Sequence, residues 1–485
     1  MIRDLPRLAR TQFDLLVVGG GVYGLATAYD AAQRGLAVAL LERGDFGAAT
    51  SFNHLKTIHG GLRYLQAADF RRMRESIRER RAFARMAPRF VAPLAFVMPA
   101  SPTLTKNPLA LSAALAIDSL IGADRNEGLD EAHRLPPGRV ISGGECRRLF
   151  DGASSAKMGA GAMWHDYQTV QGDRLTLAFA LGAAAHGAAL ANYTEAIALV
   201  RGDHTLRIIR ARDVMNGDAF EIRSRVVVNA AGPWASSLVA HSGVRCSWPL
   251  LKAMNLVTSR PAREVALVAS TKAGRSLVLL PWQGRTLVGT SESADERQAD
   301  DQTARWTELA AFLADVNDTF PGLDLGAQEV TLVHRGVVPA VRRAGRLTLA
   351  GESRIVDHAG DGLNGLISIV GVKYTTARAV AERTVDLAFT KLGRPPVACR
   401  TAEATLPTAG IGDRLPDNPI RHAIEEEMAQ TLADVMIRRT GVGAAGYPGD
   451  AMVTEHVSAM QRLLGWSIDR TASESAAVKR FYEIQ

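Results

Sequence analysis

A glycine-rich turn between two short apolar runs constrains this chain more than any other feature. Residues 15–18 (Leu-Leu-Val-Val) run directly into residues 19–24 (Gly-Gly-Gly-Val-Tyr-Gly). A helix-like stretch at 26–34 follows, and a second apolar run at 37–41 ends at Glu42. This order predicts a strand, a tight turn, a helix and a second strand, which is the unit that binds a dinucleotide at the end of a parallel sheet.

Each residue of the turn has a physical role in this prediction. Gly19 permits the tight turn, Gly21 lets the backbone approach a diphosphate, and Gly24 lets the helix pack closely on the strand. The helix N-terminus offers amide donors and a positive dipole to the phosphates. Glu42 can accept hydrogen bonds from ribose hydroxyls. The ordinary alternative is a βα turn without a ligand, and the pattern alone does not separate FAD from NAD.

The composition is that of a globular enzyme with two or three domains. The chain has 485 residues, of which 47% are hydrophobic and 22% charged. Cys146, Cys246 and Cys399 are scattered without metal-ligand spacing, so we expect buried thiols in a reducing compartment and no metal site. The first twelve residues lack an apolar core, and no run of about twenty apolar residues occurs. We therefore expect a cytoplasmic protein, or one lying on the inner face of the membrane.

A net charge of +7 and a pI of about 9.5 favour anionic partners. Much of the excess lies in one arginine-rich run at residues 71–89, in which Met73, Ile77, Phe83 and Met86 are interleaved. This spacing predicts a helix with an exposed arginine face. The face is either simply solvated or attracted to anionic lipid. Nucleic acid is disfavoured because no nucleic-acid-binding motif accompanies the charge.

A second unusual segment spans residues 108–122. It is apolar on nearly every side, and Asp118 is its only charged residue. The segment is either a buried core helix or a helix that dips into the membrane interface or docks on a partner. It is too short to cross a bilayer.

Strands and helices alternate through the rest of the chain. We expect a loop at 165–173 before a helix at 175–187, and a long helix ending near residue 392. Strands are expected at 205–211, 226–230, 251–258, 276–280, 286–290, 330–333 and 366–370. Prolines near 394–396 and 407–419 indicate a linker, followed by a helical C-terminal unit from about residue 420.

Several motifs, in one order, resemble the FAD-dependent glycerol-3-phosphate dehydrogenases of respiratory metabolism. The resemblance covers about residues 12 to 480. Besides the glycine-rich turn, it depends on Thr50-Ser51, residues 56–65 (Lys-Thr-Ile-His-Gly-Gly-Leu-Arg-Tyr-Leu), Met86-Ala87-Pro88, residues 229–234 (Asn-Ala-Ala-Gly-Pro-Trp), Pro281-Trp282, Gly289-Thr290 and residues 371–378 (Gly-Val-Lys-Tyr-Thr-Thr-Ala-Arg). Together these motifs favour FAD over NAD.

The resemblance implies an α/β (α+β) fold in three parts. A Rossmann-type FAD-binding domain would comprise residues 12–90, 160–235 and 345–395. An antiparallel-sheet substrate domain would comprise residues 91–159 and 236–344, and a small helical cap would comprise residues 396–485. The implied reaction is oxidation of a small anionic substrate, sn-glycerol 3-phosphate, to dihydroxyacetone phosphate, with electrons passed to quinone at an anionic membrane surface. A homodimer is left open.

The resemblance also assigns residues to the cofactor. The implied FAD-binding residues are Gly19, Gly21, Tyr23, Gly24, Glu42, Arg43, Thr50, Ser51, Lys56, His59, Gly60, Gly61, Leu62, Ala230, Gly232, Trp234, Gly371, Lys373, Tyr374 and Thr375. Oxidation of a secondary alcohol leaves negative charge on the reduced flavin near N1 and O2. Amides at the start of the helix after Gly371, together with the Lys373 ammonium, would stabilise that charge.

Catalytic roles are implied for Arg63, Lys373 and His59. The planar fork of Arg63 suits an anionic group better than a lysine does, and Tyr64 could donate a neutral hydrogen bond beside it. Each has an ordinary alternative: a surface salt bridge for Arg63, a surface lysine for Lys373 and a structural histidine for His59. The implied substrate-binding residues are Arg63, Tyr64, Lys252, Asn255, Thr290, Arg354 and Thr376.

Three departures from the family pattern open a second interpretation. Val338 stands where the family has an arginine that contacts the substrate, and Asn255 stands where it has a histidine. Val372 replaces a family glycine. Arg335, Arg342, Arg343 or Arg354 could compensate for the missing cation. The substrate is therefore glycerol 3-phosphate or a related polyol phosphate, sugar derivative, hydroxy acid or amine, and a flavoprotein that binds without turnover is a third reading.

Overall fold

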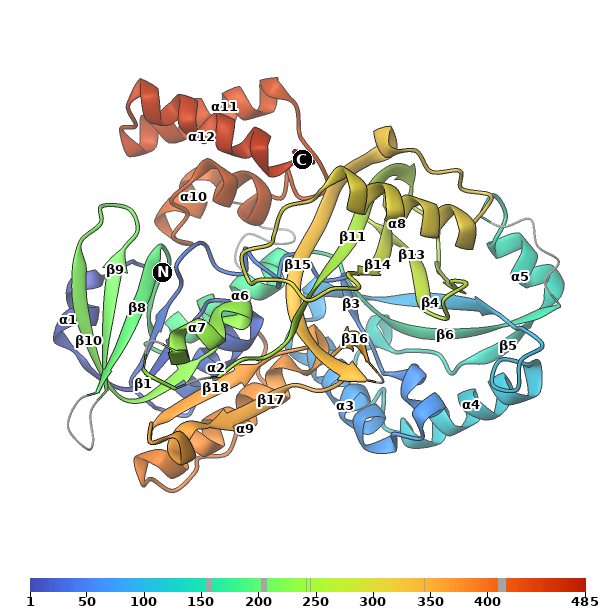
Figure 1. The fold of residues 1–485 in the computed structure, drawn as a ribbon, viewed down its shortest axis with the longest axis horizontal. Coiled ribbons are helices and arrows are strands. Elements are labelled where there is room, and N and C mark those ends of the chain that lie inside the picture. Colours follow the sequence, from blue (N-terminus) through green and yellow to red (C-terminus); the bar gives the residue numbers. More distant parts are fainter. Residues whose placement is uncertain (154–158, 202–206, 241, 245, 344, 409–415) are drawn as a thin grey trace.

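Two sheets and a helical C-terminal layer make up the molecule (Figure 1). This computed structural model describes residues 1–485 except 154–158, 202–206, 241, 245, 344 and 409–415. Parts of the predicted strand at 205–211 and of the predicted linker at 407–419 lie outside the described residues. The C-terminal helices sit at the top of Figure 1, above the junction of the two sheets.

The first sheet has the strand order β17-β18-β10-β1-β2-β7. Its strands are β1 (Gln12–Val18), β2 (Val38–Leu41), β7 (Ala189–Ala191), β10 (Ala219–Asn229), β17 (Arg354–Asp357) and β18 (Leu366–Val370), extended through β10 by β9 (Arg207–Asp213) and β8 (Thr194–Arg201). The central strands β2, β1, β10 and β18 pair in parallel. Because such strands are buried on both faces, they are nearly continuous apolar runs, as the sequence predicted.

Helices cover one face of this sheet. They are α2 (Val22–Gln33), α6 (Gly172–Ala185) and α9 (Ala377–Leu392), and their apolar side chains form one core with those of β1, β2 and β18. On the other face, α1 (Leu5–Arg10) and α7 (Ala235–Ala240) pack with the β8–β9 extension. The carboxyl ends of the parallel strands are left open, which is where ligands bind in such sheets.

The second sheet has the order β16-β15-β11-β14-β13-β12-β4-β6-β3, with β5 on β6. Its strands are β3 (Thr57–Ile58), β4 (Val91–Pro99), β5 (Arg139–Ser142), β6 (Ala160–Thr169), β11 (Leu250–Pro261), β12 (Ala266–Ser270), β13 (Ser276–Trp282), β14 (Arg285–Glu292), β15 (Val330–Arg343) and β16 (Arg346–Leu349). Apart from the parallel pair of β4 and β12, neighbouring strands pair antiparallel. Helices α5 (Gly143–Leu149) and α8 (Trp306–Thr319) pack on this sheet.

The loop expected at 165–173 is wrong over its first half. Residues 160–169 form β6, whose polar side chains look loop-like in sequence but are paired in the structure. Asp166, for example, is buried against the guanidinium of Arg80. Strands β3 and β6 belong to the second sheet although both fall within the segments predicted for the FAD domain, so those domain boundaries stay a prediction.

The arginine-rich run forms α3 (Phe70–Met86), but its exposed arginine face is smaller than expected. Met73, Ile77, Phe83 and Met86 are buried as predicted. Arg80 is buried too, contrary to the prediction, because it pairs with Asp166. The carboxylate of Asp124 binds two further arginines of the helix, Arg74 and Arg81. Most of the predicted arginine face therefore serves internal ion pairs.

Residues 108–121 form α4, which lies on the surface and is not a core helix. Asp118 is buried and binds Arg125 (2.8 Å), whereas Leu109 and Leu120 are 84% and 78% exposed. The helix thus turns its single charge toward the protein and apolar side chains toward the outside. None of the described helices is long and apolar enough to cross a membrane.

The C-terminal layer contains α10 (Pro419–Glu425), the π-helix η8 (Asp434–Arg439), α11 (Asp450–Leu464) and α12 (Ile468–Phe481). Short 3-10 helices complete the fold: η1 (Leu62–Ala67), η2 (Pro88–Phe90), η3 (Glu131–His133), η4 (Gly232–Trp234), η5 (Ala327–Glu329), η6 (His358–Asp361) and η7 (Tyr374–Thr376).

All three cysteines are free thiols. Cys146 is buried as expected, but Cys246 and Cys399 are only partly buried.

Candidate functional site

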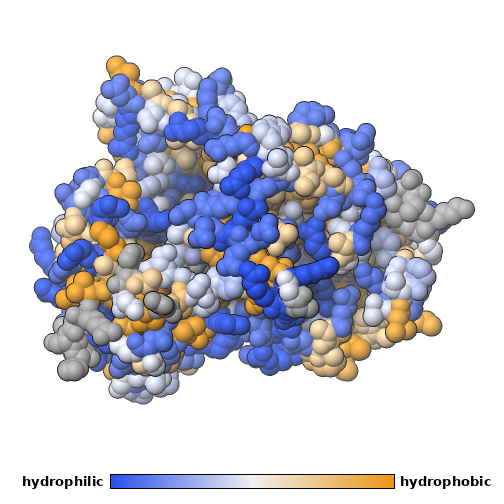
Figure 2. Space-filling model, in the orientation of Figure 1, coloured by the Kyte–Doolittle hydropathy of each residue, from blue (hydrophilic) through white to orange (hydrophobic). Residues whose placement is uncertain are grey.

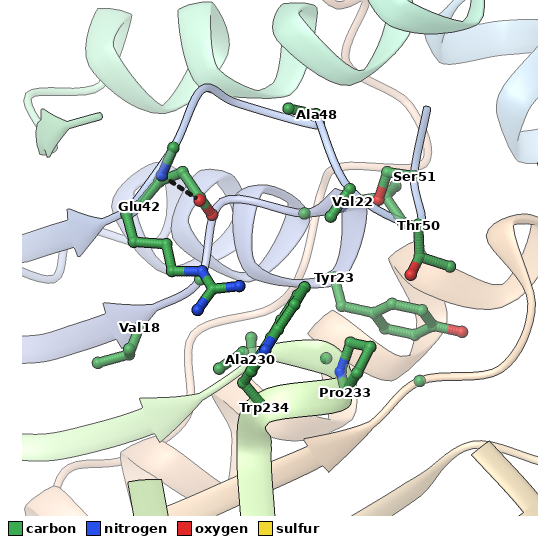
Figure 3. Close-up of a pocket in the computed structure, with 18 of the residues that line it drawn as sticks. Val18, Val22, Tyr23, Glu42, Ala48, Thr50, Ser51, Ala230, Pro233 and Trp234 are labelled. Carbon is green, nitrogen blue, oxygen red and sulfur yellow. Dashed lines mark hydrogen bonds between the residues drawn. The ribbon is translucent and has the colours of Figure 1, made fainter. Parts of the chain in front are cut away.

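A cavity of about 740 Å³ opens at the carboxyl ends of the parallel strands. It is lined by Val18 at the end of β1, Glu42 just after β2, Ala230 just after β10 and Gly371 just after β18, and Val338 of the second sheet closes it. Figure 3 shows the labelled lining residues, with Glu42, Tyr23, Ser51 and Trp234 arranged around the space. The volume falls within the range of small-molecule and cofactor sites, roughly 300–1,000 Å³.

The glycine-rich turn forms one wall of the cavity through its backbone. Gly19 has φ +107°, and a Cβ atom there would lie 2.5 Å from the carbonyl oxygen of Ala230. A Cβ atom at Gly24 would lie 1.9 Å from the carbonyl oxygen of Gly19. No side chain fits at either position without moving backbone. The glycines therefore bring β1, α2 and the end of β10 together at the cavity.

The N-terminus of α2 points its amides at the same wall. Its N-cap is Gly21, which has no side chain to satisfy the first amides. Val22 N–H donates instead to Ser51 Oγ (2.9 Å), a hydroxyl on the loop after β2. The loop that carries Thr50 and Ser51 is thereby fastened to the end of the helix that would hold a diphosphate.

Glu42 is held in the cavity by the backbone on either side of it. Its Oε2 accepts a hydrogen bond from Gly20 N–H (2.6 Å), and its Oε1 accepts one from Gly44 N–H (2.7 Å; Figure 3). Burial raises the pKa of this carboxyl, and the two amide donors oppose that rise. Each carboxylate oxygen keeps a second lone pair for a sugar hydroxyl.

Arg43 and Trp234 face each other at the cavity wall. The Arg43 guanidinium lies 3.8 Å from the centre of the Trp234 ring, and Trp234 Nε1 donates to Asp300 Oδ1 (2.6 Å). Asp300 lies on the loop between β14 and α8, so these contacts join the first sheet to the second.

Tyr23 organises the turn after β18. Its hydroxyl donates to Lys373 O (2.6 Å) and accepts from the amides of Val372 (3.0 Å) and Lys373 (2.9 Å). A Cβ atom at Gly371 would lie 2.3 Å from the Tyr23 ring, so glycine is required there. Burial raises the pKa of Tyr23, which keeps the hydroxyl protonated as a donor. The first turn of α2 and the turn after β18 (residues 371–376, the late turn) are thus held together by hydrogen bonds.

The side chain of Lys56 is buried and contacts Phe52 and Trp282. Lys56 is fully buried; its Nζ donates to Phe52 O and lies 5.2 Å from the centre of the Trp282 ring. Burial lowers the pKa of its ammonium. Lys56 was predicted to bind the cofactor, but among the described residues it is not part of the cavity lining, so that role stays a prediction.

His59 and Gly60 follow β3 of the second sheet, and His59 contacts the late turn of the first. His59 N–H donates to Thr375 Oγ1 (3.2 Å), and Gly60 N–H donates to Asp166 Oδ1 (2.6 Å). Burial lowers the pKa of His59 to about 4, so the imidazole is neutral near pH 7. Gly61 has φ +80°, which suits glycine, and it precedes η1, where Leu62 begins the helix.

The predicted catalytic side chains gather beside η1 and η7. Lys373 Nζ lies 4.3 Å from the centre of the Tyr64 ring, and Arg72 lies 5.2 Å from the same ring. Arg63 is exposed on η1. Lys373 and Thr376 line a second, smaller cavity on the outer side of the late turn. The side chain of Lys373 therefore points away from the large cavity in this conformation.

The remaining predicted substrate residues are dispersed. Lys252 is buried in an ion-pair network with Glu308 (2.6 Å) and Asp301 (3.3 Å). Asn255 accepts a hydrogen bond from Thr290 Oγ1 (2.7 Å), and Arg354 is exposed at the start of β17. The structure thus gives Lys252 a structural setting and brings Asn255 and Thr290 together; their roles toward a substrate stay predictions.

Sequence reasoning missed part of the cavity wall. The unpredicted lining includes His54, Thr194, Glu195, Asp300, Gln302, Val337 and Pro339. His54 stacks on Tyr374 with ring centres 4.3 Å apart, and burial lowers its pKa well below the ordinary value. Thr194 and Glu195 follow β7, which pairs in parallel with β2, and that position was a usable signal. The loop carrying Asp300 and Gln302 offers no local pattern.

Comparison with protein families matches two parts of the chain. The family model described as FAD dependent oxidoreductase matches residues 14–386, and a model described as C-terminal domain of alpha-glycerophosphate oxidase matches residues 413–471. Together they cover both sheets and most of the helical layer.

Individual proteins agree with these models. A glycerol-3-phosphate dehydrogenase from Synechocystis sp. is 32% identical over 431 residues, which are 84% of this chain and 75% of that protein. A glycerol-3-phosphate dehydrogenase from Mycobacterium leprae is also 32% identical, over 79% of this chain but only 64% of that protein. The solved structure of a Bacillus halodurans glycerol-3-phosphate dehydrogenase complexed with FAD superposes with a TM-score of 0.76 at 21% identity, covering 98% of this chain and 95% of that one. At that identity the superposition supports the fold alone.

Proposed function

Because this chain belongs to the family of FAD-dependent oxidoreductases, we propose that it oxidises sn-glycerol 3-phosphate to dihydroxyacetone phosphate and delivers the electrons to a quinone. The family makes FAD its cofactor. The observation that carries the proposal is the combination of a dinucleotide cavity at the glycine turn with relatives named glycerol-3-phosphate dehydrogenase over four fifths of the chain.

The residues of the cavity fit FAD. The turn at Gly19 and Gly21 and the α2 N-terminus would receive the diphosphate, because they offer backbone amides and Gly19 has no room for a side chain. Glu42 would accept hydrogen bonds from the ribose. The isoalloxazine would lie against the turn at Gly371, which Tyr23 holds in place. When bound, FAD supplies a hydride acceptor at N5.

The chain's own residues would perform three tasks. Arg63, exposed on η1, would bind the phosphate of the substrate through its planar fork. The imidazole of His59, which a pKa of about 4 leaves neutral at pH 7, would accept a hydrogen bond from the substrate hydroxyl. The Lys373 ammonium and the amides of η7 would stabilise negative charge at the late turn. Lys373 needs a change of side-chain rotamer to reach the large cavity.

Anaerobic mixing of the FAD-loaded protein with a panel of polyols and polyol phosphates tests the proposal. Loss of the oxidised flavin absorbance with sub-millimolar glycerol 3-phosphate, but not with glycerol, is the expected result. Bleaching by another compound alone would contradict the proposed substrate while leaving the flavin chemistry intact.

Val338 favours a second candidate, which is the same flavin chemistry on a different substrate. It lines the cavity where the family places a substrate-binding arginine, and valine cannot bind a phosphate. The same panel, extended to hydroxy acids and amines, distinguishes the two candidates.

We also propose that α4 carries the protein onto an anionic membrane, where quinone is dissolved. Leu109, Ile117 and Leu120 lie on one exposed face of a helix whose only charge is turned inward. Apolar side chains also gather over α4 at the lower right of Figure 2. The net charge of +7 would add attraction to anionic lipid.

Flotation with phosphatidylglycerol vesicles tests this membrane proposal. Replacing Leu109 and Leu120 with serine should reduce the floated fraction several-fold, because each buried leucine contributes roughly 1.5–3 kcal/mol of apolar transfer. The control is Ile468→Ser, which removes an equally exposed apolar side chain (80%) from α12. Equal flotation of both variants would contradict the role of α4.

A further inference from the structure

The outer side of the late turn carries a second cavity of about 260 Å³. It lies between α3, the start of β17 and the first turns of α9, and Lys373 and Thr376 of the turn after β18 also line it. The volume is below the range typical of drug-sized ligands, roughly 300–1,000 Å³, so any ligand here is small.

Positive charge exceeds negative charge around this space. Four cationic side chains line it, Arg71, Arg72, Lys373 and Arg383, against two carboxylates, those of Glu75 and Glu352. These groups come from three separate segments of the chain, so the excess is a product of the fold and of no single charge run.

The two carboxylates are already engaged by arginines at the rim. Arg71 binds Glu352 (2.6 Å) and Arg383 binds Glu75 (2.7 Å). Arg72 binds Asp69, on the same helix. These pairs hold the guanidinium groups around the opening, and each planar guanidinium keeps further N–H donors free for an additional acceptor.

Lys373 has no such carboxylate. Within the described part of the chain, no Asp or Glu oxygen lies within 4.0 Å of its Nζ, which lies 4.3 Å from the centre of the Tyr64 ring. Burial, with Arg72 next to it, lowers the pKa of this ammonium to about 8. Glu75 and Glu352 act on Lys373 only from beyond ion-pair distance and are each paired with an arginine, so an anion placed here would add a counter-charge in direct contact.

We propose that this second cavity binds a small phosphate-bearing anion through Arg71, Arg383 and the Lys373 ammonium. Guanidinium forks and a lysine point charge are the donors that proteins use for phosphate groups. A bound dianion would hold Lys373 on the outer side of the turn and keep it charged. The site is additional to the substrate phosphate site proposed at Arg63, which does not line this cavity, and its occupancy does not require turnover.

Calorimetric titration of inorganic phosphate into the FAD-loaded protein tests this site. The informative variant is Arg71→Gln with Arg383→Gln, since both side chains are well exposed (81% and 52%) and their loss leaves the core intact. The matched control is Arg394→Gln, another exposed arginine in an ion pair, with Asp14 (2.8 Å). We expect the wild type and the control to bind phosphate alike and the double variant to bind it roughly tenfold more weakly or worse.

Three outcomes would overturn the inference. They are an absence of phosphate binding by the wild type, equal affinity in the double variant and the control, and binding of phosphatidylglycerol vesicles without any binding of inorganic phosphate or glycerol 3-phosphate. The last would assign the arginines to a lipid surface. Flavin reduction by glycerol 3-phosphate is measured separately, so failure of the proposed reaction and failure of this site are distinguishable.

Discussion

The two walls of the cofactor cavity are built in different ways. The wall formed by the first sheet depends on close backbone packing: a Cβ atom at Gly19, Gly24 or Gly371 would lie within 2.5 Å of other atoms, and side chains such as Glu42 and Trp234 complete the lining. The wall formed by the second sheet is made of side chains such as Val338 and Gln302, which come from a strand and a loop far apart in sequence. Side chains on the second wall can change without disturbing the backbone that we propose to hold the cofactor. Cofactor and substrate specificity can therefore diverge independently.

Adding a methyl group to the backbone wall should have the largest effect. Gly24→Ala places a Cβ atom 1.9 Å from the Gly19 carbonyl oxygen, so helix and strand must separate. We expect FAD affinity to fall more than roughly a hundredfold, since overpacking against backbone costs about 3 kcal/mol or more. Flavin content after purification measures the effect. The control Gly360→Ala meets no atom within 4 Å and should retain FAD; full flavin content in both variants would refute the role given to this wall.

The next largest effect should come from the contacts between Asp45, on the loop after β2, and the C-terminal layer. Burial alone would raise the pKa of Asp45, but Arg439 and Arg438 lower it, and Asp45 accepts hydrogen bonds from both (2.6–2.8 Å). Asp45→Asn removes the carboxylate that these two buried guanidinium groups share and leaves them only Asp434 (2.5 Å from Arg438) and the more distant Glu427 (3.8 Å from Arg439), at a cost of about 3 kcal/mol. Chemical denaturation should show that loss of unfolding free energy, together with weaker FAD binding. A change below 1 kcal/mol would mean that the helical layer does not brace the loop.

A change in the side-chain wall should alter substrate preference and leave the cofactor bound. Val338→Arg introduces a cation into the cavity, and one charge-assisted contact is worth on the order of tenfold in kcat/KM for glycerol 3-phosphate. Val338→Gln, which is long but neutral, is the control. Stopped-flow flavin reduction compares the two. If arginine gives no gain over glutamine, the second wall is shaped for a different ligand.

The smallest predicted effect is a pH dependence of stability at the junction of the two walls. Burial lowers the pKa of His59 from its ordinary 6.5 to about 4. Between these values the unfolded chain binds a proton that the folded protein does not, so unfolding free energy should fall as pH drops from 6.5 toward 4. His59→Gln should reduce that loss by on the order of 1 kcal/mol per pH unit, measured by denaturation at several pH values. The exposed residue His186 provides the control, and an unchanged slope in His59→Gln would contradict burial of a neutral imidazole.

The difference between the walls also explains what could be predicted from the sequence. The glycine turn, Glu42 and the parallel strands follow from local spacing, because their roles depend on backbone geometry within one segment. The strand β6 was mistaken for a loop since its polar residue Asp166 is satisfied by Arg80, eighty-six positions away in the chain. Lys252, on β11 of the second sheet, is a similar case. Its ion pairs with Glu308 and Asp301 join residues about fifty positions apart and could not be inferred without the fold.

The structure of the flavin-loaded protein tests the central claim most directly. The account predicts the diphosphate against the backbone at Gly19 and Gly21, the adenosine ribose at Glu42, and the isoalloxazine beside the turn at Gly371. FAD bound elsewhere, or a protein that stays colourless after incubation with excess FAD, would contradict it.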